Sequence, residues 1–161
     1  MPISSFWLCS IIFISFCYIG FKIWGEYRNR RDFFCDLVRF CDHLTTEINF
    51  SKNTIEQVVN RYIDTYNCGF TEVLLKYSHL LSKNADITRE ALREFITRDD
   101  VVDFFFELGK HSACEECEKI KSARLRFESL YLNAKDKLAR EASIYFKICI
   151  IVGVGVVILI L

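Results

Sequence analysis

Residues Ile148–Leu161 have the sequence ICIIVGVGVVILIL, which contains no charged side chain. Eleven of these fourteen residues are Ile, Val or Leu, and each favours insertion into a bilayer by roughly 0.3–0.6 kcal/mol at the centre of a helix. Fourteen residues make only about 21 Å of helix, short of a hydrocarbon core of about 30 Å. Extension back to Ile144, with the Lys147 side chain reaching the headgroups, gives about 27 Å. We therefore predict a C-terminal transmembrane helix over 144–161, the alternative being a buried helix of a soluble core.

A second uncharged run occupies Pro2–Phe21 at the other end of the chain. A helix of this length spans about 30 Å, which matches the thickness of the bilayer core. A cleaved signal peptide is the alternative, but no Lys or Arg precedes the apolar run and no small-x-small cleavage site follows it. We therefore predict an uncleaved transmembrane helix over 1–25.

All 21 Lys+Arg and all 21 Asp+Glu side chains lie between these two runs, from Lys22 to Lys147. Basic residues follow the first run and precede the last, at Lys22, Arg28, Arg30, Arg31, Lys135, Lys137, Arg140 and Lys147. By the positive-inside rule, the middle of the chain is cytoplasmic and both termini lie on the other side of the membrane. The eight cysteines are scattered and do not suggest a disulfide framework, which fits the same reducing compartment. A net charge of zero argues against nucleic acid as a partner.

The middle segment, 26–143, shows helical periodicity throughout. Apolar residues recur every three or four positions over 31–48, 55–66, 70–81, 88–97, 100–109 and from 112 onward. Asn53 is expected to cap the second helix with Glu56 as its capping-box partner, and Gly109 to end the fifth. The sixth helix contains no breaker before the membrane. We expect an all-α fold, an antiparallel bundle of about six helices flanked by the N-terminal and C-terminal transmembrane helices.

One cluster contains residue types that bind metals, the spacing His111-x-x-Cys114-x-x-Cys117. It supplies half of a zinc site, since a structural zinc needs four ligands. Cys35, Cys41 and His43 would complete the set only if the fold brought them near. Residues at i, i+3 and i+6 also spread around a helix, so ordinary helical cysteines are the favoured interpretation and no metal is predicted.

The sequence contains no phosphate-binding glycine loop, no HExxH and no GxSxG motif. We therefore predict that the chain is not an enzyme and has no cofactor. The acidic trio Glu115, Glu116 and Glu118 favours a solvated surface, with partner docking as the alternative. Gly153-x-Gly155 is a weak signal for a helix contact within lipid, because residues at i and i+2 do not share a helix face.

Several local features occur in a fixed order along the chain. They are Gly20-Phe21 at the end of the first apolar run, Arg30-Arg31, Leu37, Leu44, Glu47-Ile48-Asn49-Phe50, Thr54-Ile55-Glu56 and Phe106-Glu107-Leu108-Gly109. In this order and spacing, over essentially the whole chain, the sequence resembles the stage III sporulation protein AB family of endospore-forming bacteria. The resemblance marks Glu47, Ile48, Phe50, Leu108 and Gly109 as family-motif positions.

The resemblance implies a soluble domain similar to the cytoplasmic domains of the type II secretion platform protein. It implies a platform component of the apparatus that connects the mother cell and the forespore, in the outer forespore membrane with the middle domain in the mother-cell cytoplasm. Its partners would be the lipid bilayer, a hexameric secretion-type ATPase and other proteins of the same complex, and a homo-oligomer is compatible with this role. Two alternatives stay open: a small membrane-bound thiol or zinc protein that uses His111, Cys114 and Cys117, and a membrane adaptor unrelated to sporulation.

Overall fold

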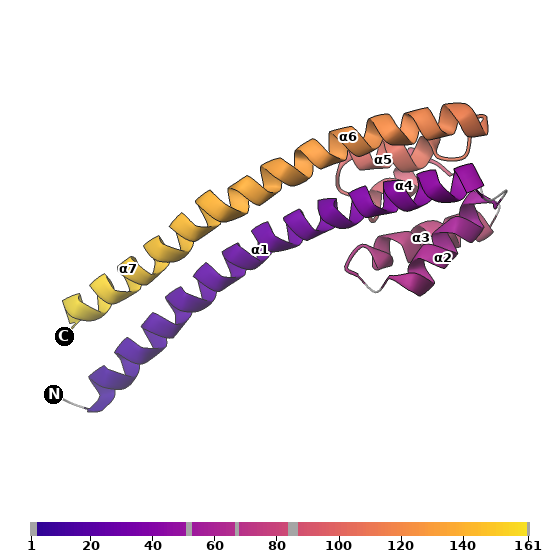
Figure 1. Ribbon diagram of the computed structural model, residues 1–161. Helices are drawn as coiled ribbons and strands as arrows, with labels where there is room; N and C mark the ends of the chain where they lie inside the picture. The colour runs from indigo at the N-terminus through magenta and orange to yellow at the C-terminus, as the bar shows by residue number, and fades with distance from the viewer. Residues whose placement is uncertain (1–2, 51–52, 67, 84–86, 161) are drawn as a thin grey trace. The chain divides into compact units, whose positions relative to one another are not determined.

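The computed structural model describes residues 3–50, 53–66, 68–83 and 87–160, without the side chains of residues 3–6, 8, 9, 159 and 160. The elements in chain order are α1 Ile3–Phe50, α2 Ile55–Thr65, α3 Thr71–Ser82, α4 Arg89–Arg93, α5 Asp99–Glu107, α6 Ala113–Lys137, a π-helical segment η1 Leu138–Ala142, and α7 Ser143–Ile160 (Figure 1). Because α6, η1 and α7 follow one another without a break, these residues form six helical rods and no strand. The all-α fold class is therefore confirmed.

The chain forms two compact units. The terminal unit consists of Met1–Asp32 and Leu130–Leu161, and the central unit of Phe33–Ser129. The domain limits predicted from the sequence, after residue 25 and before residue 144, describe membrane boundaries and stay a prediction. The two units divide at other positions because α1 and α6 continue beyond the apolar runs into charged sequence.

Aromatic side chains dominate the core of the central unit. The ring of Phe105 on α5 lies at its centre, with its centroid 4.7 Å from that of Tyr77, 6.0 Å from Phe40 and 6.2 Å from Phe70. None of these four side chains has exposed surface. Each buried aromatic ring removes a large apolar area from water, so the stripes expected on α1, α3 and α5 meet in one core.

Two buried tyrosines place their hydroxyl groups on backbone carbonyls. Tyr62 donates to the carbonyl oxygen of Asp36 at 3.4 Å, and Tyr77 donates to that of Phe105 at 3.2 Å. Burial raises the pKa of both phenols, so the hydroxyl groups keep their protons and remain donors. Each tyrosine therefore joins two helices by a directional bond as well as by packing.

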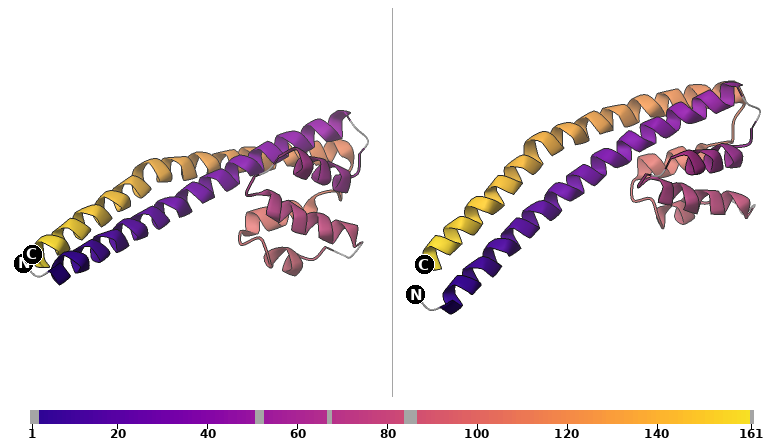
Figure 2. Two further views of the ribbon diagram at one scale, coloured as in Figure 1. Left: turned by 90° about the horizontal axis from the view of Figure 1, so that it is seen from below. Right: turned by 60° about the horizontal axis from the view of Figure 1, so that its bottom comes forward.

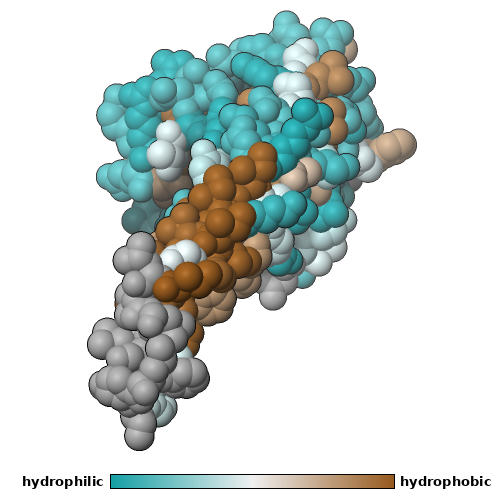
Figure 3. Space-filling view, turned by 90° about the vertical axis from the view of Figure 1, so that its left-hand side faces the viewer, coloured by the Kyte–Doolittle hydropathy of each residue, from teal (hydrophilic) through white to brown (hydrophobic). Residues whose placement is uncertain are grey.

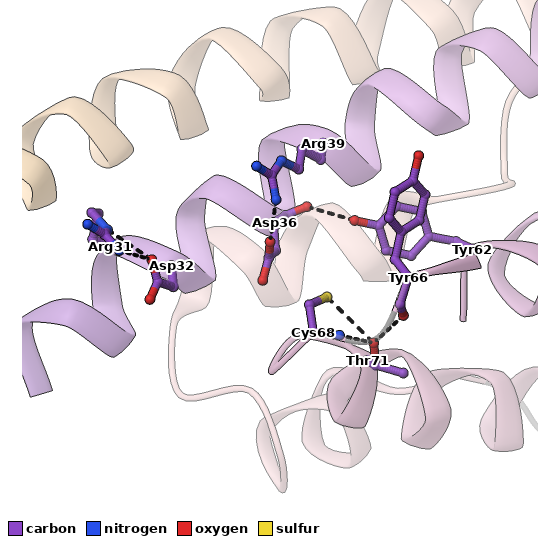
Figure 4. Close-up of polar contacts among 8 residues, drawn as sticks. All are labelled: Arg31, Asp32, Asp36, Arg39, Tyr62, Tyr66, Cys68 and Thr71. Atoms are coloured by element: carbon purple, nitrogen blue, oxygen red, sulfur yellow. Dashed lines mark hydrogen bonds and ion pairs between the residues drawn. The ribbon is translucent and has the colours of Figure 1, made fainter. Parts of the chain in front are cut away.

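The turn between α2 and α3 is closed by one side chain. The Thr71 hydroxyl donates to the carbonyl oxygen of Tyr66 at 3.0 Å and accepts the Cys68 N–H at 3.2 Å (Figure 4). The same view shows Asp36 on α1, whose carboxylate accepts from Arg39 at 3.3 Å. The two Thr71 bonds satisfy backbone groups that the ends of α2 and α3 leave without helical partners.

The N-terminus of α2 begins one residue later than the sequence suggested. Thr54 is the N-cap: its hydroxyl accepts the Gln57 N–H at 3.4 Å, and the Gln57 side chain accepts the Thr54 N–H at 3.1 Å. The prediction of Asn53 with Glu56 was wrong, because Thr54 and Gln57 make the same reciprocal pair. Asn53 instead donates its side-chain amide to Glu47 at 3.1 Å.

The helix expected over 88–97 is shorter in the structure. Thr88 caps α4 by accepting the Ala91 N–H, but the helix ends at Arg93. The end of α5 at Gly109 is confirmed, since this glycine has φ +85°. A Cβ at this position would also lie 3.2 Å from Cγ1 of Ile55. Only glycine meets both conditions without strain.

In the terminal unit, the first part of α1 and the length of α7 run antiparallel, with the start of α1 and the end of α7 at the same end (Figures 1 and 2). Each helix offers one glycine to the other. A Cβ at Gly20 would lie 3.1 Å from Cδ2 of Phe146, and a Cβ at Gly153 would lie 3.2 Å from Cβ of Phe16. The helix contact inferred from the glycine pair is therefore made by Gly153, whereas Gly155 has open space around it.

The sixth helix has no breaker, as expected, but it contains a π-helical segment that the sequence analysis did not anticipate. Ala134 and Ala142 are buried and Leu138 and Phe146 are half-buried, at a spacing of four residues. On a regular α-helix each step of four overshoots a turn by about 40°. The i→i+5 bonds of a π turn hold more residues per turn, so the four side chains stay on one face.

Large apolar side chains are exposed on the terminal unit and gather on the face that Figure 3 shows. The exposed large ones on its two helices include Trp7, Ile11, Ile14, Phe21, Ile148, Ile151 and Ile158. Among the described residues, one helix, Ala113–Ile158, is long and apolar enough to cross a membrane, and 11% of its apolar window is buried. The alternative of a buried core helix therefore does not hold for α7. The predicted N-terminal span includes residues 1–6, 8 and 9, which lie outside the described side chains.

Candidate functional site

A groove of about 730 Å³ opens on the central unit between α5 and α6, beside the start of α4. Apolar side chains that are themselves nearly or fully buried contribute to it, among them Leu108, Ile120 and Ala123. The rest of the lining is polar and consists of Arg89, Asp103, Glu107, His111, Glu115, Glu116, Glu118, Lys119, Ser122 and Arg126, together with the ring of Phe104. So many charges at an open groove suit recognition of another protein better than a small apolar ligand.

Two ion pairs join the sides of the groove. Arg89 Nε lies 2.9 Å from Asp103 Oδ1, and Lys119 Nζ lies 3.3 Å from Glu107 Oε2. Lys119 also contacts His111 Nε2 at 2.6 Å. These charges are compensated within the central unit, so they contribute little to the field that an approaching partner meets.

Glu118 and Arg126 lie at the same groove and are exposed. Neither belongs to an ion pair within the part of the chain that the structure describes. Lys121, on the same helix, is also exposed but does not line the groove. Glu118 and Arg126 are therefore available to a partner, and Lys121 is a matched position away from the site.

Glu116 is the one buried carboxylate of the groove, with 5% of its surface exposed. Its Oε1 accepts the backbone N–H of Gly109 at 2.9 Å, in the loop that follows α5. Its Oε2 is buried and has no hydrogen-bond partner among the residues that the structure describes. A buried carboxylate oxygen without a donor is costly, so this atom stands out among the polar groups of the central unit.

The three residues considered for zinc do not converge. Cys117 is buried and its thiol contacts Oδ1 of Asn49 at 3.5 Å, Cys114 is exposed, and His111 contacts Lys119. Within the described ranges, no group of three or more His, Cys, Asp or Glu side chains could hold a metal ion. The arrangement therefore gives the zinc interpretation no geometric support.

The further candidates Cys35, Cys41 and His43 lie on α1. Cys41 has no exposed surface, and burial raises the pKa of its thiol to about 12. The His43 ring lies 5.3 Å from that of Tyr62 and 6.4 Å from that of Tyr66. Its Nε2 is buried and has no hydrogen-bond partner in the described part of the chain. Desolvation lowers the pKa of His43, so the ring favours its neutral form.

The comparison with protein families decides the identity of the chain. The model described as stage III sporulation protein AB matches residues 5–161. The chain belongs to the stage III sporulation protein AB family. Searches of the curated proteins and of the solved structures gave no match. The resemblance noted in the sequence is therefore confirmed, and the protein is a member of a sporulation family.

The five residues predicted to be motif positions of the stage III sporulation protein AB family lie near the C-terminal ends of α1 and α5, and their place in a family motif stays a prediction. Glu47 near the end of α1 accepts from Arg61 on α2 at 2.9 and 3.0 Å, which ties the two helices together. Leu108 is buried and Gly109 forms the left-handed turn after α5. Phe50, at the end of α1, has 88% of its side chain exposed. Ile48, between Glu47 and Phe50 on α1, is half-buried.

In this member of the stage III sporulation protein AB family, the acidic trio Glu115, Glu116 and Glu118 is evident from the sequence, whereas the groove that it lines is not. Glu115 and Glu118 are exposed as expected, whereas Glu116 is buried. A signal was present: Glu116 precedes Cys117 and lies four residues before Ile120, so it borders the apolar stripe of α6. The partner carbonyls, amides and ion pairs of a groove depend on tertiary packing and have no local pattern.

Proposed function

We propose that this protein is a non-enzymatic platform component of the sporulation apparatus between mother cell and forespore, and that its central unit docks a cytoplasmic secretion-type ATPase. The two apolar helices of the terminal unit would hold the protein in the outer forespore membrane, with the central unit in the mother-cell cytoplasm. The match to the stage III sporulation protein AB family over residues 5–161 carries the proposal.

The terminal unit supports the membrane role. Large apolar side chains are exposed on it, and the helix given above as Ala113–Ile158 is long and apolar enough to cross a bilayer. The close contacts at Gly20 and Gly153 join α1 and α7 into a pair. Attachment through two helices would resist rotation of the central unit when a motor protein pulls on it, which a single tether would not.

The groove between α5 and α6 supports the docking role. Its unpaired charges, Glu118 and Arg126, are exposed beside apolar side chains, as in the polar rim of a protein interface. The neighbouring pairs Arg89–Asp103 and Lys119–Glu107 fix the sides of the groove. Such a preformed surface binds without ordering a loop first.

Copurification tests the proposal. The full chain, carrying an affinity tag, is solubilised from sporulating cells in mild detergent, and the secretion-type ATPase is measured in the eluate. We expect the ATPase to copurify with the native protein and with Lys121→Glu, and to be reduced about tenfold or more by Glu118→Lys. Each variant reverses one exposed charge of α6, and only Glu118 lines the groove.

The thermal stability of each variant provides the control. Both substitutions are at exposed positions of α6, so their Tm values should stay close to that of the native protein. Absence of the ATPase from the native eluate at low and at moderate salt would overturn the docking proposal. Equal loss of the ATPase with Lys121→Glu and Glu118→Lys would show that the groove is not the docking site.

A further inference from the structure

Glu116 has a buried carboxylate group of which only one oxygen accepts a hydrogen bond within the described residues. Glu116 Oε1 is held by the Gly109 N–H, whereas Oε2 has no donor within the described residues. The side chain lines the groove and is 5% exposed. A carboxylate that is held in place and lacks a donor is prepared to accept one from outside the chain.

The charges around Glu116 indicate the sign of that donor. The groove contains five carboxylates, at Asp103, Glu107, Glu115, Glu116 and Glu118, against the three cations Arg89, Lys119 and Arg126. The ion pairs of Asp103 and Glu107 use two of the cations. The three other carboxylates, Glu115, Glu116 and Glu118, face the single remaining cation, Arg126. The groove therefore favours a positively charged group and disfavours a phosphate or an acidic peptide.

The apolar lining indicates what surrounds that charge. Leu108, Ile120 and Ala123 form a buried apolar base of the groove. Next to it, the Phe104 ring meets the Phe127 ring edge-on, with the ring centroids 5.4 Å apart. An arginine or lysine brings an apolar stem to such a surface while its charged head reaches a carboxylate. Neighbouring apolar side chains of the same segment would cover the rest of the base.

We propose that the groove between α5 and α6 receives a segment of a partner protein that presents an arginine or lysine between apolar side chains, and that its cationic group binds Oε2 of Glu116. This inference rests on the proposed function, in which the partner is the ATPase. It adds the chemistry of the segment that is recognised. Glu118 steers the segment and Glu116 holds it.

Photocrosslinking in sporulating cells tests the inference on the full chain. The photoreactive amino acid benzoylphenylalanine is placed at Ser122, which lines the groove, and at Lys121, which does not. Both positions are exposed and adjacent on α6, so they report different faces of one helix. The crosslinked peptide is identified by mass spectrometry.

We expect a crosslink from position 122 to a segment with an arginine or lysine flanked by apolar residues, and a much weaker one from position 121. If that segment belongs to the ATPase, both proposals hold. If it belongs to another protein of the complex, the groove inference holds and ATPase docking at this site fails. No crosslink at 122, equal crosslinking at both positions, or an acidic or uncharged segment would overturn the inference.

Glu116→Gln separates binding from folding. Glutamine retains the oxygen that accepts the Gly109 N–H and removes the charge. We expect crosslinking from position 122 to fall about tenfold or more with unchanged Tm. Glu118→Gln provides a second variant that makes no buried contact, and a smaller reduction is expected there. Undiminished crosslinking in both variants would contradict the assignment.

Discussion

Tyr27 on α1 donates its hydroxyl to Oε2 of Glu141 in the π-helical segment, at 3.2 Å and across 114 residues of sequence. This bond joins the two arms of the terminal unit just beyond their apolar stretches. The π turn and the hydrogen bond occur at the same level, and π turns are often found where a helix has a functional role. The Tyr27–Glu141 hydrogen bond therefore adds a polar contact between the two arms to the close contacts at Gly20 and Gly153.

Tyr27→Phe tests the contribution of the Tyr27–Glu141 hydrogen bond to stability. The ring stays and only the hydroxyl is lost, so we expect a small decrease in Tm of the full chain in detergent. Tyr18→Phe is the matched control, since Tyr18 is an exposed tyrosine of α1. A decrease as large in the control would show that the Tyr27–Glu141 bond has no particular importance.

Gly153→Val tests the close approach of α1 and α7. A Cβ at Gly153 already lies 3.2 Å from Phe16, so two further methyl groups force the helices apart. We expect a destabilisation of about 1–3 kcal/mol, measured by thermal unfolding in detergent. Gly155→Val, two residues away in open space, should leave Tm unchanged. The same effect from both variants would exclude a specific glycine contact.

His43→Phe tests the effect of pH on the central unit. Desolvation lowers the pKa of His43 in the folded protein, so the unfolded chain binds the proton more readily. The stability that His43 contributes is therefore present above its unfolded pKa of about 6.5 and is lost as the pH falls below it. Glu47 opposes this shift and Arg61 adds to it.

We expect the Tm of the native protein to fall between pH 7.5 and pH 5, and His43→Phe to reduce that fall while keeping the ring contacts with Tyr62 and Tyr66. His79→Phe is the control at an exposed histidine. A pH dependence that His43→Phe leaves intact would assign the acid sensitivity to other groups.

Thiol alkylation tests the burial of α1. Cys41 is fully buried and the pKa of its thiol is about 12, so at pH 8 about one molecule in ten thousand carries the reactive thiolate. Cys114 is exposed. In the folded, detergent-solubilised protein we expect rapid alkylation of Cys114 and none of Cys41 until the chain is unfolded, as followed by mass spectrometry. Similar rates at the two thiols would contradict the described core.

Much of the helical architecture could be predicted from periodicity alone. The apolar stripes of α1, α2, α3 and α5 are strong because each contributes to one core, and Gly109 marks a turn that only glycine adopts. The cap of α2 was displaced by one residue because Asn53 and Thr54 have similar capping propensity. Which of them caps depends on Glu47, which binds the Asn53 side chain from another helix.

The π segment and the groove could not be predicted for a related reason. A four-residue spacing from Ala134 to Phe146 fits α-helical periodicity locally, and the accumulated rotation matters only once α1 lies alongside. Likewise, burial of Glu116 depends on the Gly109 loop, seven residues earlier, folding back over it. Sequence patterns describe one helix at a time, whereas both features arise between segments.

The proposed function requires that both ends of the chain cross the membrane and that the central unit lies in the cytoplasm. The direct test produces variants with one cysteine each in the plasma membrane of growing cells, where the side opposite the cytoplasm is open to the medium, and adds an impermeant thiol reagent to the intact cells. Cys114 serves as the central reporter because it is exposed, and Pro2→Cys and Leu161→Cys report the two ends. We expect labelling at both ends and none at Cys114 until the membrane is permeabilised. Labelling of Cys114 in intact cells, or protection of Leu161→Cys, would contradict the two-pass arrangement.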